Sequence, residues 1–331
     1  MAKLQVGFDF GTGDLKIAVC DGSAVRKLVV QPVPDRLVKQ GRIVSFEAMS
    51  DFLKQTVSKH RLGAKNCAVV LPSGLAYLRR VRMPAMTTEQ LKVNLPYEFR
   101  DYLTMDKDKY FYDYALDAMH SDNSGKPVEL ELTTAAVEKR IIGEYSEMFR
   151  RAGFRLQAAA PVECAYLNVI RAQAASSGAL EECCILDLGH EATRIHIFHN
   201  GKFEATRVIE LGTGSVDRAI ADTLGIDEFV ARSHKEANLN GAQELQSAIS
   251  VYNAIAVEIM KAVNFYGFNN QQSNLRHCYF CGGGARIPAL MQAISSAVDL
   301  VMHPAQELLT NAALKETELG LGMAAIGIAM Q

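Results

Sequence analysis

Apolar and polar residues alternate in three short runs at the start of the chain. Val6 and Phe8 alternate with Gly7 and Asp9, and the same period resumes at Leu15 after a glycine-containing turn. A period of two residues is typical of a half-buried strand. The pattern predicts strands at 3–9, 15–21 and 26–32 and then a helix at 45–60, where apolar residues recur at helical spacing. Three strands followed by a helix indicate the start of an α/β lobe.

The middle of the chain is predicted to add shorter elements of both kinds. Thr87 and Gln90 have the spacing of a capping box, in which two side chains satisfy backbone amides at a helix N-terminus. This predicts a helix that runs toward Leu103, with a kink at Pro96 because proline lacks an amide proton. Strands are predicted at 67–72, 75–84, 110–119 and 128–137, and a helix at 138–152.

The order of elements at the start of the chain is repeated at 182–211. Strand, Asp-x-Gly turn, strand, short turn and strand follow again, and Asp187 and Gly189 stand where Asp9 and Gly11 stood. One repetition over a large separation indicates two lobes of like topology rather than a solenoid. A chain of 331 residues is long enough for two such lobes with a cleft between them. Further helices are predicted at 215–224, 226–239 and 242–267.

Charge and cysteine content narrow the function classes. The 35 basic and 37 acidic residues nearly balance, and without a basic tract no nucleic-acid surface is expected. Seven cysteines scattered through apolar segments, with no secretory leader, indicate a reducing compartment, so the expected location is the cytoplasm. No apolar run approaches the roughly 20 residues of a membrane helix. Any membrane role is therefore expected to come through a partner rather than by direct insertion.

Three glycine-containing turns carry the candidate chemistry. Glycines beside strand ends let backbone amides approach an anion, and a hydroxyl or a lysine completes such a cradle. Asp9 and Asp187, one in each repeat, are candidates to hold Mg²⁺ through water, because this ion keeps most of its hydration shell. The alternative for Lys16 is an exposed strand position. The predicted phosphate and nucleoside contacts are Gly11, Thr12, Gly13 and Lys16 in the first turn, Gly189 and Thr193 in the second, and Gly282, Gly283 and Gly284 in the third.

These turns resemble a known set of motifs. "DFGTGDLK" (9–16) has the spacing of the first phosphate motif of the actin, sugar kinase and heat-shock chaperone superfamily, and "LDLGHEAT" (186–193) resembles the second. "CGGGARIPAL" (281–290) resembles its adenosine motif. Within the superfamily the chain is similar to the PilM family, actin-like proteins of type IV pilus assembly, and more distantly to the cell-division protein FtsA. The stretches that carry this likeness are 69–103, 161–172 and 208–227.

The resemblance implies a fold and a division of the chain. It implies an α/β actin-like ATPase fold with two ribonuclease-H-like lobes and an extra subdomain of the FtsA type. ATP with Mg²⁺ is expected in the cleft between the lobes, where Lys235 fits the helix lysine that flanks the adenosine. The implied divisions are 1–79 with 151–180 for the first lobe, 80–150 for the extra subdomain and 181–331 for the second lobe.

The chain departs from the family pattern at its phosphate turns. Asp14 adds a negative charge to the first turn, where a small neutral residue is expected, and His190 and Glu191 make the second turn bulkier and more acidic. Arg232 stands where the family usually has a glutamate for the ribose. These changes argue against tight ATP binding and more strongly against hydrolysis.

Hydrolysis needs an acid or amide that positions water near the γ-phosphate. By family position the candidate catalytic residue is Glu163, although the helix dipole alone also favours an acid at a helix N-terminus. The favoured function is therefore an ATP-gated scaffold of a type IV pilus, or of a related secretion or competence machinery, with slow or absent turnover. The alternatives are a phosphotransferase of the sugar kinase type and an FtsA-like cell-division protein.

The resemblance also implies a partner. In PilM-like proteins the N-terminal tail of a membrane-anchored, PilN-like protein is expected between the core and the extra subdomain, which would hold the chain at the inner face of the membrane. An extended peptide can add to a strand edge, and arginines favour carboxylates. The alternative is a strand internal to its sheet with solvated arginines. Self-association into a ring or filament stays open. The candidate contacts are Arg80, Arg82, Tyr97 and Phe99.

Overall fold

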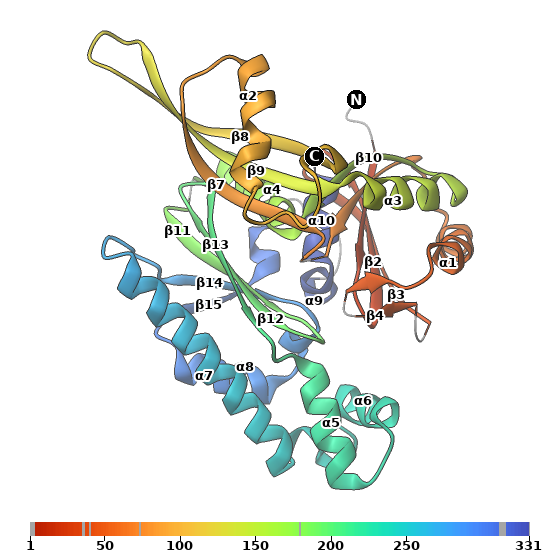
Figure 1. Cartoon of the computed structure of the whole chain (residues 1–331). Helices are drawn as coiled ribbons and strands as arrows, with labels where there is room; N and C mark the ends of the chain where they lie inside the picture. The colour runs from red at the N-terminus through yellow and green to blue at the C-terminus, as the bar shows by residue number, and fades with distance from the viewer. Residues whose placement is uncertain are drawn as a thin grey trace.

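The computed structural model describes residues 4–34, 37–39, 41–72, 74–178, 180–310 and 316–330. Two five-stranded sheets form the body of the molecule, and a three-stranded sheet lies beside them (Figure 1). The first sheet has the order β10-β6-β1-β2-β3. Its strands are β1 (Gln5–Phe10), β2 (Asp14–Asp21), β3 (Ala24–Pro32), β6 (Asn66–Leu71) and β10 (Arg155–Pro161).

The second sheet repeats the topology of the first. Its order is β15-β14-β11-β12-β13. On one side of the central strand β11 neighbouring strands pair in parallel, and on the other side they pair antiparallel, as around β1 in the first sheet. The repetition expected at 182–211 is therefore confirmed. The strands are β11 (Glu182–Leu188), β12 (Thr193–His199), β13 (Lys202–Ile209), β14 (His277–Cys281) and β15 (Val301–Pro304).

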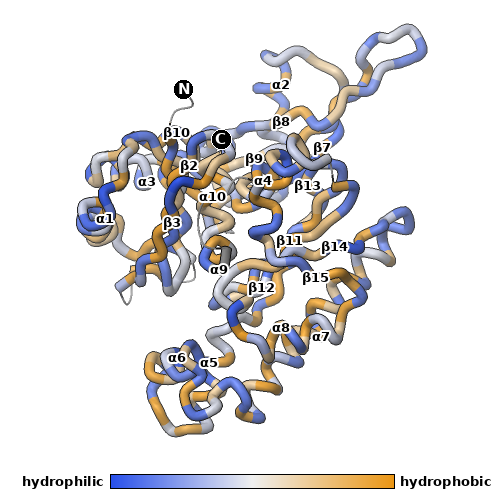
Figure 2. Tube along the Cα trace, turned by 180° about the vertical axis from the view of Figure 1, so that it is seen from behind, coloured by the Kyte–Doolittle hydropathy of each residue, from blue (hydrophilic) through white to orange (hydrophobic). Residues whose placement is uncertain are grey.

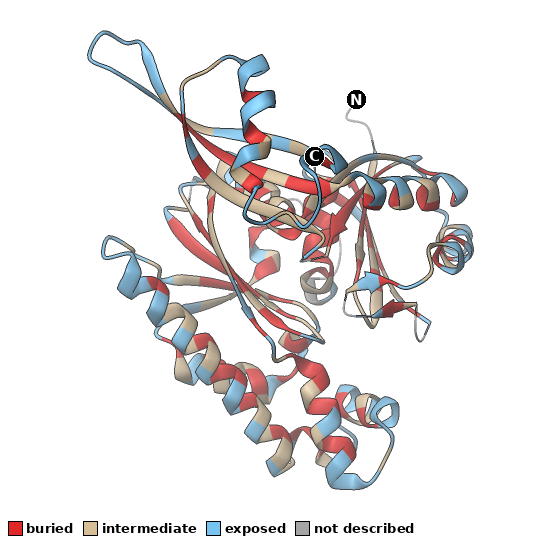
Figure 3. Cartoon of the chain, in the orientation of Figure 1, coloured by how far each residue is buried: buried red, intermediate tan, exposed pale blue. Residues whose placement is uncertain are grey.

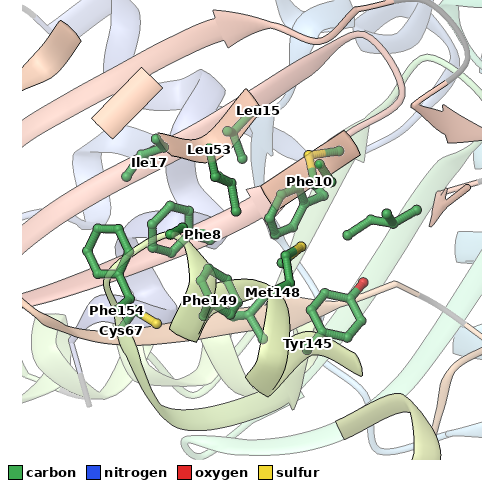
Figure 4. Close-up of a cluster of buried hydrophobic side chains, with 14 of the residues drawn as sticks. Phe8, Phe10, Leu15, Ile17, Leu53, Cys67, Tyr145, Met148, Phe149 and Phe154 are labelled. Atoms are coloured by element: carbon green, nitrogen blue, oxygen red, sulfur yellow. The ribbon is translucent and has the colours of Figure 1, made fainter. Parts of the chain in front are cut away.

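Helices bury the outer faces of both sheets. In the first lobe, Ser45 caps helix α1 (Phe46–His60), and α3 (Lys139–Arg151) packs beside it. Figure 4 shows the aromatic core beneath them, where the ring centroids of Phe8 and Phe149 are 4.8 Å apart. In the second lobe the helices are α5 (Thr213–Leu224), α6 (Glu228–Ala237), α7 (Gln246–Asn269) and α8 (Pro288–Ala297). Three further short elements of the chain are β4 (Val38–Lys39), β5 (Arg42–Ile43) and α9 (Glu316–Leu319).

The third sheet forms a small subdomain. Its strands are β7 (Ala76–Pro84), β9 (Pro127–Glu138) and β8 (Tyr110–Ser121), in that order. The capping box of Thr87 is present at helix α2 (Thr88–Asn94), which passes into a 3-10 turn at Leu95–Phe99 instead of continuing with a kink. The reason is Pro96, which lies at the start of that turn. The β8–β9 hairpin projects from the body, and its end is hydrophilic and exposed (Figures 2 and 3).

Helix α3 belongs with the first sheet rather than with the small subdomain. Ile141, Tyr145, Met148 and Phe149 all lie in the core cluster of the first lobe, together with β1 and β2. The expected division at residue 150 would assign this helix to the small subdomain. We therefore propose that the small subdomain ends with β9, and that the chain returns to the first lobe at α3.

Two helices lie between the sheets. Helix α4 (Val162–Ser177) and helix α10 (Met323–Ala329) pack against each other, and α10 also contacts β1, β2 and β6. A Cβ atom at Gly327 would overlap the carbonyl oxygen of Ala165, and one at Gly7 would overlap the carbonyl oxygen of Ala325. Within the described ranges, no helix combines the length and the apolar character of a membrane span. The apolar end of the chain is thus an internal layer of the fold.

This backbone contact predicts a large cost for a single methyl group. Replacing Gly327 by Ala should lower the free energy of unfolding by about 1–3 kcal/mol or more, because the new atom has no space beside Ala165. The control is Gly143→Ala in α3, where a Cβ meets nothing within 4 Å and helix propensity favours alanine. Thermal and urea unfolding should separate the two variants in opposite directions. Equal stability of both variants would contradict the packing described.

Candidate functional site

A cleft of about 550 Å³ lies between the two lobes, within the size range of ligand sites. It forms where the central strands β1 and β11 end, because the repeated turns that follow them face the same space. Phe10 and Val162 of the first lobe and Thr213 of the second also line it. The expected site residues that line the cleft are Asp9, Gly11, Thr12, Gly13, Lys16, Asp187, Gly189, Lys235, Gly282 and Gly283.

The first turn places the ammonium of Lys16 close to the carboxylate of Asp9 at the C-terminal end of β1. Asp9 and Lys16 are directly opposite in the β1–β2 ladder, and Lys16 Nζ lies 3.9 Å from Asp9 Oδ2. The amide of Gly11 donates to the carbonyl of Asp14 at 3.0 Å and closes the turn. A Cβ at Gly11 would lie 2.5 Å from Lys16 Nζ and 3.0 Å from the carbonyl oxygen of Asp14, so glycine leaves room for the ammonium beside the turn.

The second turn repeats this device with an arginine. Asp187 is opposite Arg194 in the β11–β12 ladder, and Arg194 also lines the cleft. Its Nε is buried and has no hydrogen-bond partner among the described residues. The sequence reasoning missed Arg194, although a signal was present: it follows Asp187 by the same interval that separates Lys16 from Asp9.

The carboxylates of the two repeated turns, Asp9 and Asp187, interact electrostatically. Burial raises the pKa of Asp9 above its ordinary value, Lys16 lowers it in part, and the charge of Asp187 raises it again. A divalent cation would relieve this repulsion, so the pair fits Mg²⁺ held by few direct carboxylates. The two cations, Lys16 and Arg194, suit an anionic group in the same place.

The third turn brings the backbone of β14 against that of β11. Gly282 has φ 89°, and a Cβ there would lie 2.7 Å from the carbonyl oxygen of Leu188, so only glycine fits. Gly283 faces open space and lines the cleft. Gly284 does not line it, because it packs on Leu188, where a Cβ would lie 2.8 Å from the side chain.

Two further expected contacts, Thr193 and Lys235, are buried at or behind the wall of the cleft. Thr193 is buried in β12 and does not line the cleft, since the alternation of the strand turns the next residue, Arg194, toward it. Lys235 lines the cleft, but its side chain is buried. Its Nζ lies 2.6 Å from Asp217 Oδ1 and 3.2 Å from the carbonyl oxygen of Thr213. Burial lowers the pKa of Lys235, and Asp217 partly offsets this. The lysine therefore ties α6 to α5 at the wall of the cleft.

Glu163, the expected catalytic residue, lies outside the lining of the cleft. It faces the second sheet, where Thr206 Oγ1 donates to its Oε1 at 2.8 Å. His196 Nδ1 lies 2.9 Å from that hydroxyl and 3.4 Å from the carboxylate. Because the hydroxyl proton goes to Glu163, Nδ1 of His196 is the donor to Thr206. The carboxylate therefore joins α4 to β12 and β13 across the lobes.

The expected partner contacts divide into exposed and buried groups. Strand β7 pairs only with β9 among the described strands, so it is an edge strand and not internal. Arg80 forms an ion pair with Glu204 of β13, and Arg82 Nη2 lies 2.6 Å from Glu131 Oε1 while the side chain stays 68% exposed. Tyr97 is half exposed. Phe99 is fully buried in the small subdomain, so it is a core residue and no surface contact.

Comparisons with known proteins now identify the family. The family model described as type IV pilus assembly protein PilM matches residues 7–331, almost the whole chain. The chain belongs to this family. A comparison with curated proteins gave no significant match.

Solved structures share the fold of this PilM family member. A PilM–PilN type IV pilus biogenesis complex has a TM-score of 0.82 at 19% identity, covering 100% of this chain and 98% of that chain. The ethanolamine utilization protein EutJ from Carboxydothermus hydrogenoformans has a TM-score of 0.61 at 15% identity, covering 99% and 89%. MreB5 of Spiroplasma citri bound to AMPPNP has a TM-score of 0.54 at 14% identity, covering 99% and 95%. The actin-like fold with two repeated lobes is thereby confirmed, and the sugar kinase and FtsA alternatives are not favoured.

The contacts of Glu163 predict a role in stability. Burial raises the pKa of Glu163, but the close contact with His196, together with hydrogen bonds from the backbone and from Thr206, outweighs this and lowers it from 4.5 to about 2. One pKa unit corresponds to about 1.4 kcal/mol, so the shift corresponds to roughly 3 kcal/mol. This stability is fully present above pH 4.5 and is lost as pH falls through about 2.

Glu163→Gln should therefore be less stable at neutral pH and should lose less stability on acidification between those values. Thermal unfolding at a series of pH values measures this, with the exposed Glu181→Gln as the control. A variant with the same pH profile as the parent would show that the His196 contact does not hold the carboxylate ionised.

Proposed function

We propose that this chain is an ATP-binding scaffold of type IV pilus machinery, in which ATP in the cleft sets the arrangement of the lobes. The observation that carries the proposal is the pair of opposed turns at one cleft, each with an acid, a glycine and a cation in register. Lys16 and Arg194 would neutralise the phosphates, and Gly11, Gly189 and Gly282 would allow close backbone approach. Asp9 and Asp187 would hold Mg²⁺, largely through water.

The same geometry favours a scaffold over a rapid ATPase. The acid expected to position water, Glu163, is held by Thr206 and His196 outside the cleft lining. Family membership and the likeness to a PilM–PilN complex support a role in assembly. ATP binding then acts by favouring one lobe arrangement, and turnover is slow or absent.

The partner we propose is the N-terminal tail of a membrane-anchored, PilN-like protein. The edge strand β7 can accept an extended peptide, and Arg82 is an exposed cation on this strand, ion-paired with Glu131 of β9. Tyr97 adds a half-exposed aromatic ring on the same subdomain. Such a tail would keep a cytoplasmic chain at the inner face of the membrane.

The cations of the two turns should contribute equally to ATP binding. Lys16→Ala and Arg194→Ala should each lower the affinity for ATP with Mg²⁺ about tenfold to hundredfold, because one charge-assisted contact is worth about 1.5–3 kcal/mol. Titration calorimetry measures the affinity. The control is Lys92→Ala on α2, an exposed lysine of the small subdomain. Unchanged affinity in both cleft variants would remove the nucleotide from this site.

The tail should depend on Arg82. A labelled N-terminal peptide of the neighbouring membrane-anchored pilus protein should bind the parent and should bind Arg82→Gln about tenfold more weakly, since a cation at the edge is lost. Arg80 is left intact because it ties β7 to β13. The matched control is Arg26→Gln, another exposed, ion-paired arginine, on edge strand β3. Equal affinity for parent and Arg82→Gln excludes this edge, and no binding to the parent excludes the tail.

A further inference from the structure

Two charged residues from opposite lobes, Asp14 and Arg232, meet across the cleft. Asp14 begins β2 at the first turn, and Arg232 lies on α6 of the opposite lobe. Arg232 Nη2 lies 3.7 Å from Asp14 Oδ2, and Nε lies 3.0 Å from Glu236 Oε1 on the same helix. Both Arg232 and Asp14 line the cleft, at 28% and 34% side-chain exposure. The ion pair thus bridges the lobes inside the candidate nucleotide site.

The backbone of the first turn is shaped to receive this guanidinium. A Cβ at Gly13 would overlap Arg232 Nη2 and would lie 2.6 Å from Nη1. The carbonyl of Gly13 accepts from the amide of Val33 at 3.0 Å, which holds the turn against the residue that follows β3. Glycine at position 13 therefore leaves the guanidinium its place against the turn, and a larger residue would displace it.

The pair changes the electrostatics of the turn. An unpaired Asp14 would repel an anionic ligand bound at residues 11–16, and Arg232 supplies the opposite charge from the other lobe. Burial lowers the pKa of Arg232, but Glu236 and then Asp14 outweigh this, so the guanidinium stays charged.

We propose that Arg232 and Asp14 act as one unit, in which Arg232 neutralises Asp14 across the cleft so that a triphosphate can bind beside it. This rests on the proposed function, since it specifies how the cleft tolerates a carboxylate in its first phosphate turn. Arg232 is a positioning residue in this scheme. Its effect on the nucleotide depends on Asp14, and Gly13 gives it access.

The test is a set of coupled substitutions measured by calorimetry with ATP and Mg²⁺. Arg232→Gln should weaken ATP binding about tenfold in the parent and at most twofold when Asp14→Asn is already present. Gly13→Ala should likewise weaken binding in the parent and have little further effect in Arg232→Gln. The same loss in both backgrounds would overturn the coupling. The control is the exposed Arg218→Gln on α5.

A second measurement needs no nucleotide. Amide hydrogen exchange in peptides that span residues 10–16 should be at least threefold faster in Arg232→Gln than in the parent, and unchanged in Arg218→Gln. Unchanged exchange in Arg232→Gln would overturn the bridge even if ATP binds. If the parent binds no ATP, the proposed function fails, and the exchange measurement alone decides whether the bridge between the lobes exists.

Discussion

The structure depends on close backbone contact at two glycines, Gly7 on strand β1 and Gly327 on helix α10. Gly7 and Gly327 let α10 lie directly on β1 and on α4, so α10 is held between the first sheet and α4. Helix α4 then presents Tyr166 to His196 of the second sheet, with ring centres 5.1 Å apart. The relative position of the two sheets, and with it the width of the cleft, follows from this layer. Any group larger than hydrogen at either glycine would displace it.

The cleft is built from one local device used twice. A strand ends in Asp, a glycine turn follows, and the returning strand carries a cation opposite the acid. Within each lobe the pairing is a consequence of antiparallel register and needs no long-range contact. The two turns face each other across the cleft because the lobes pack through the layer that contains α4 and α10. A site with two acids and two cations arises in this way from duplication.

Strand β13 connects the cleft region to the small subdomain. Its Thr206 donates to Glu163 of α4, and its Glu204 forms an ion pair with Arg80 of β7. Glu204 falls at an irregularity of the β12–β13 ladder, where its neighbours Phe203 and Ala205 pair with successive residues of β12. The edge of the second sheet therefore contacts both the helix between the lobes and the strand that we propose for the partner tail.

The sequence by itself determined the local elements and the repeat. Alternation and helical spacing predicted the strands and helices, the capping box of Thr87 marked α2, and the recurrence of Asp-x-Gly predicted two like lobes. These features depend on neighbours in the chain, so a pattern reveals them. Only the tertiary structure decided which side chains meet. Glu163 accepts a hydrogen bond from Thr206, and Arg232 forms an ion pair with Asp14. Burial and contact between distant segments depend on how the lobes pack, and no local spacing encodes that.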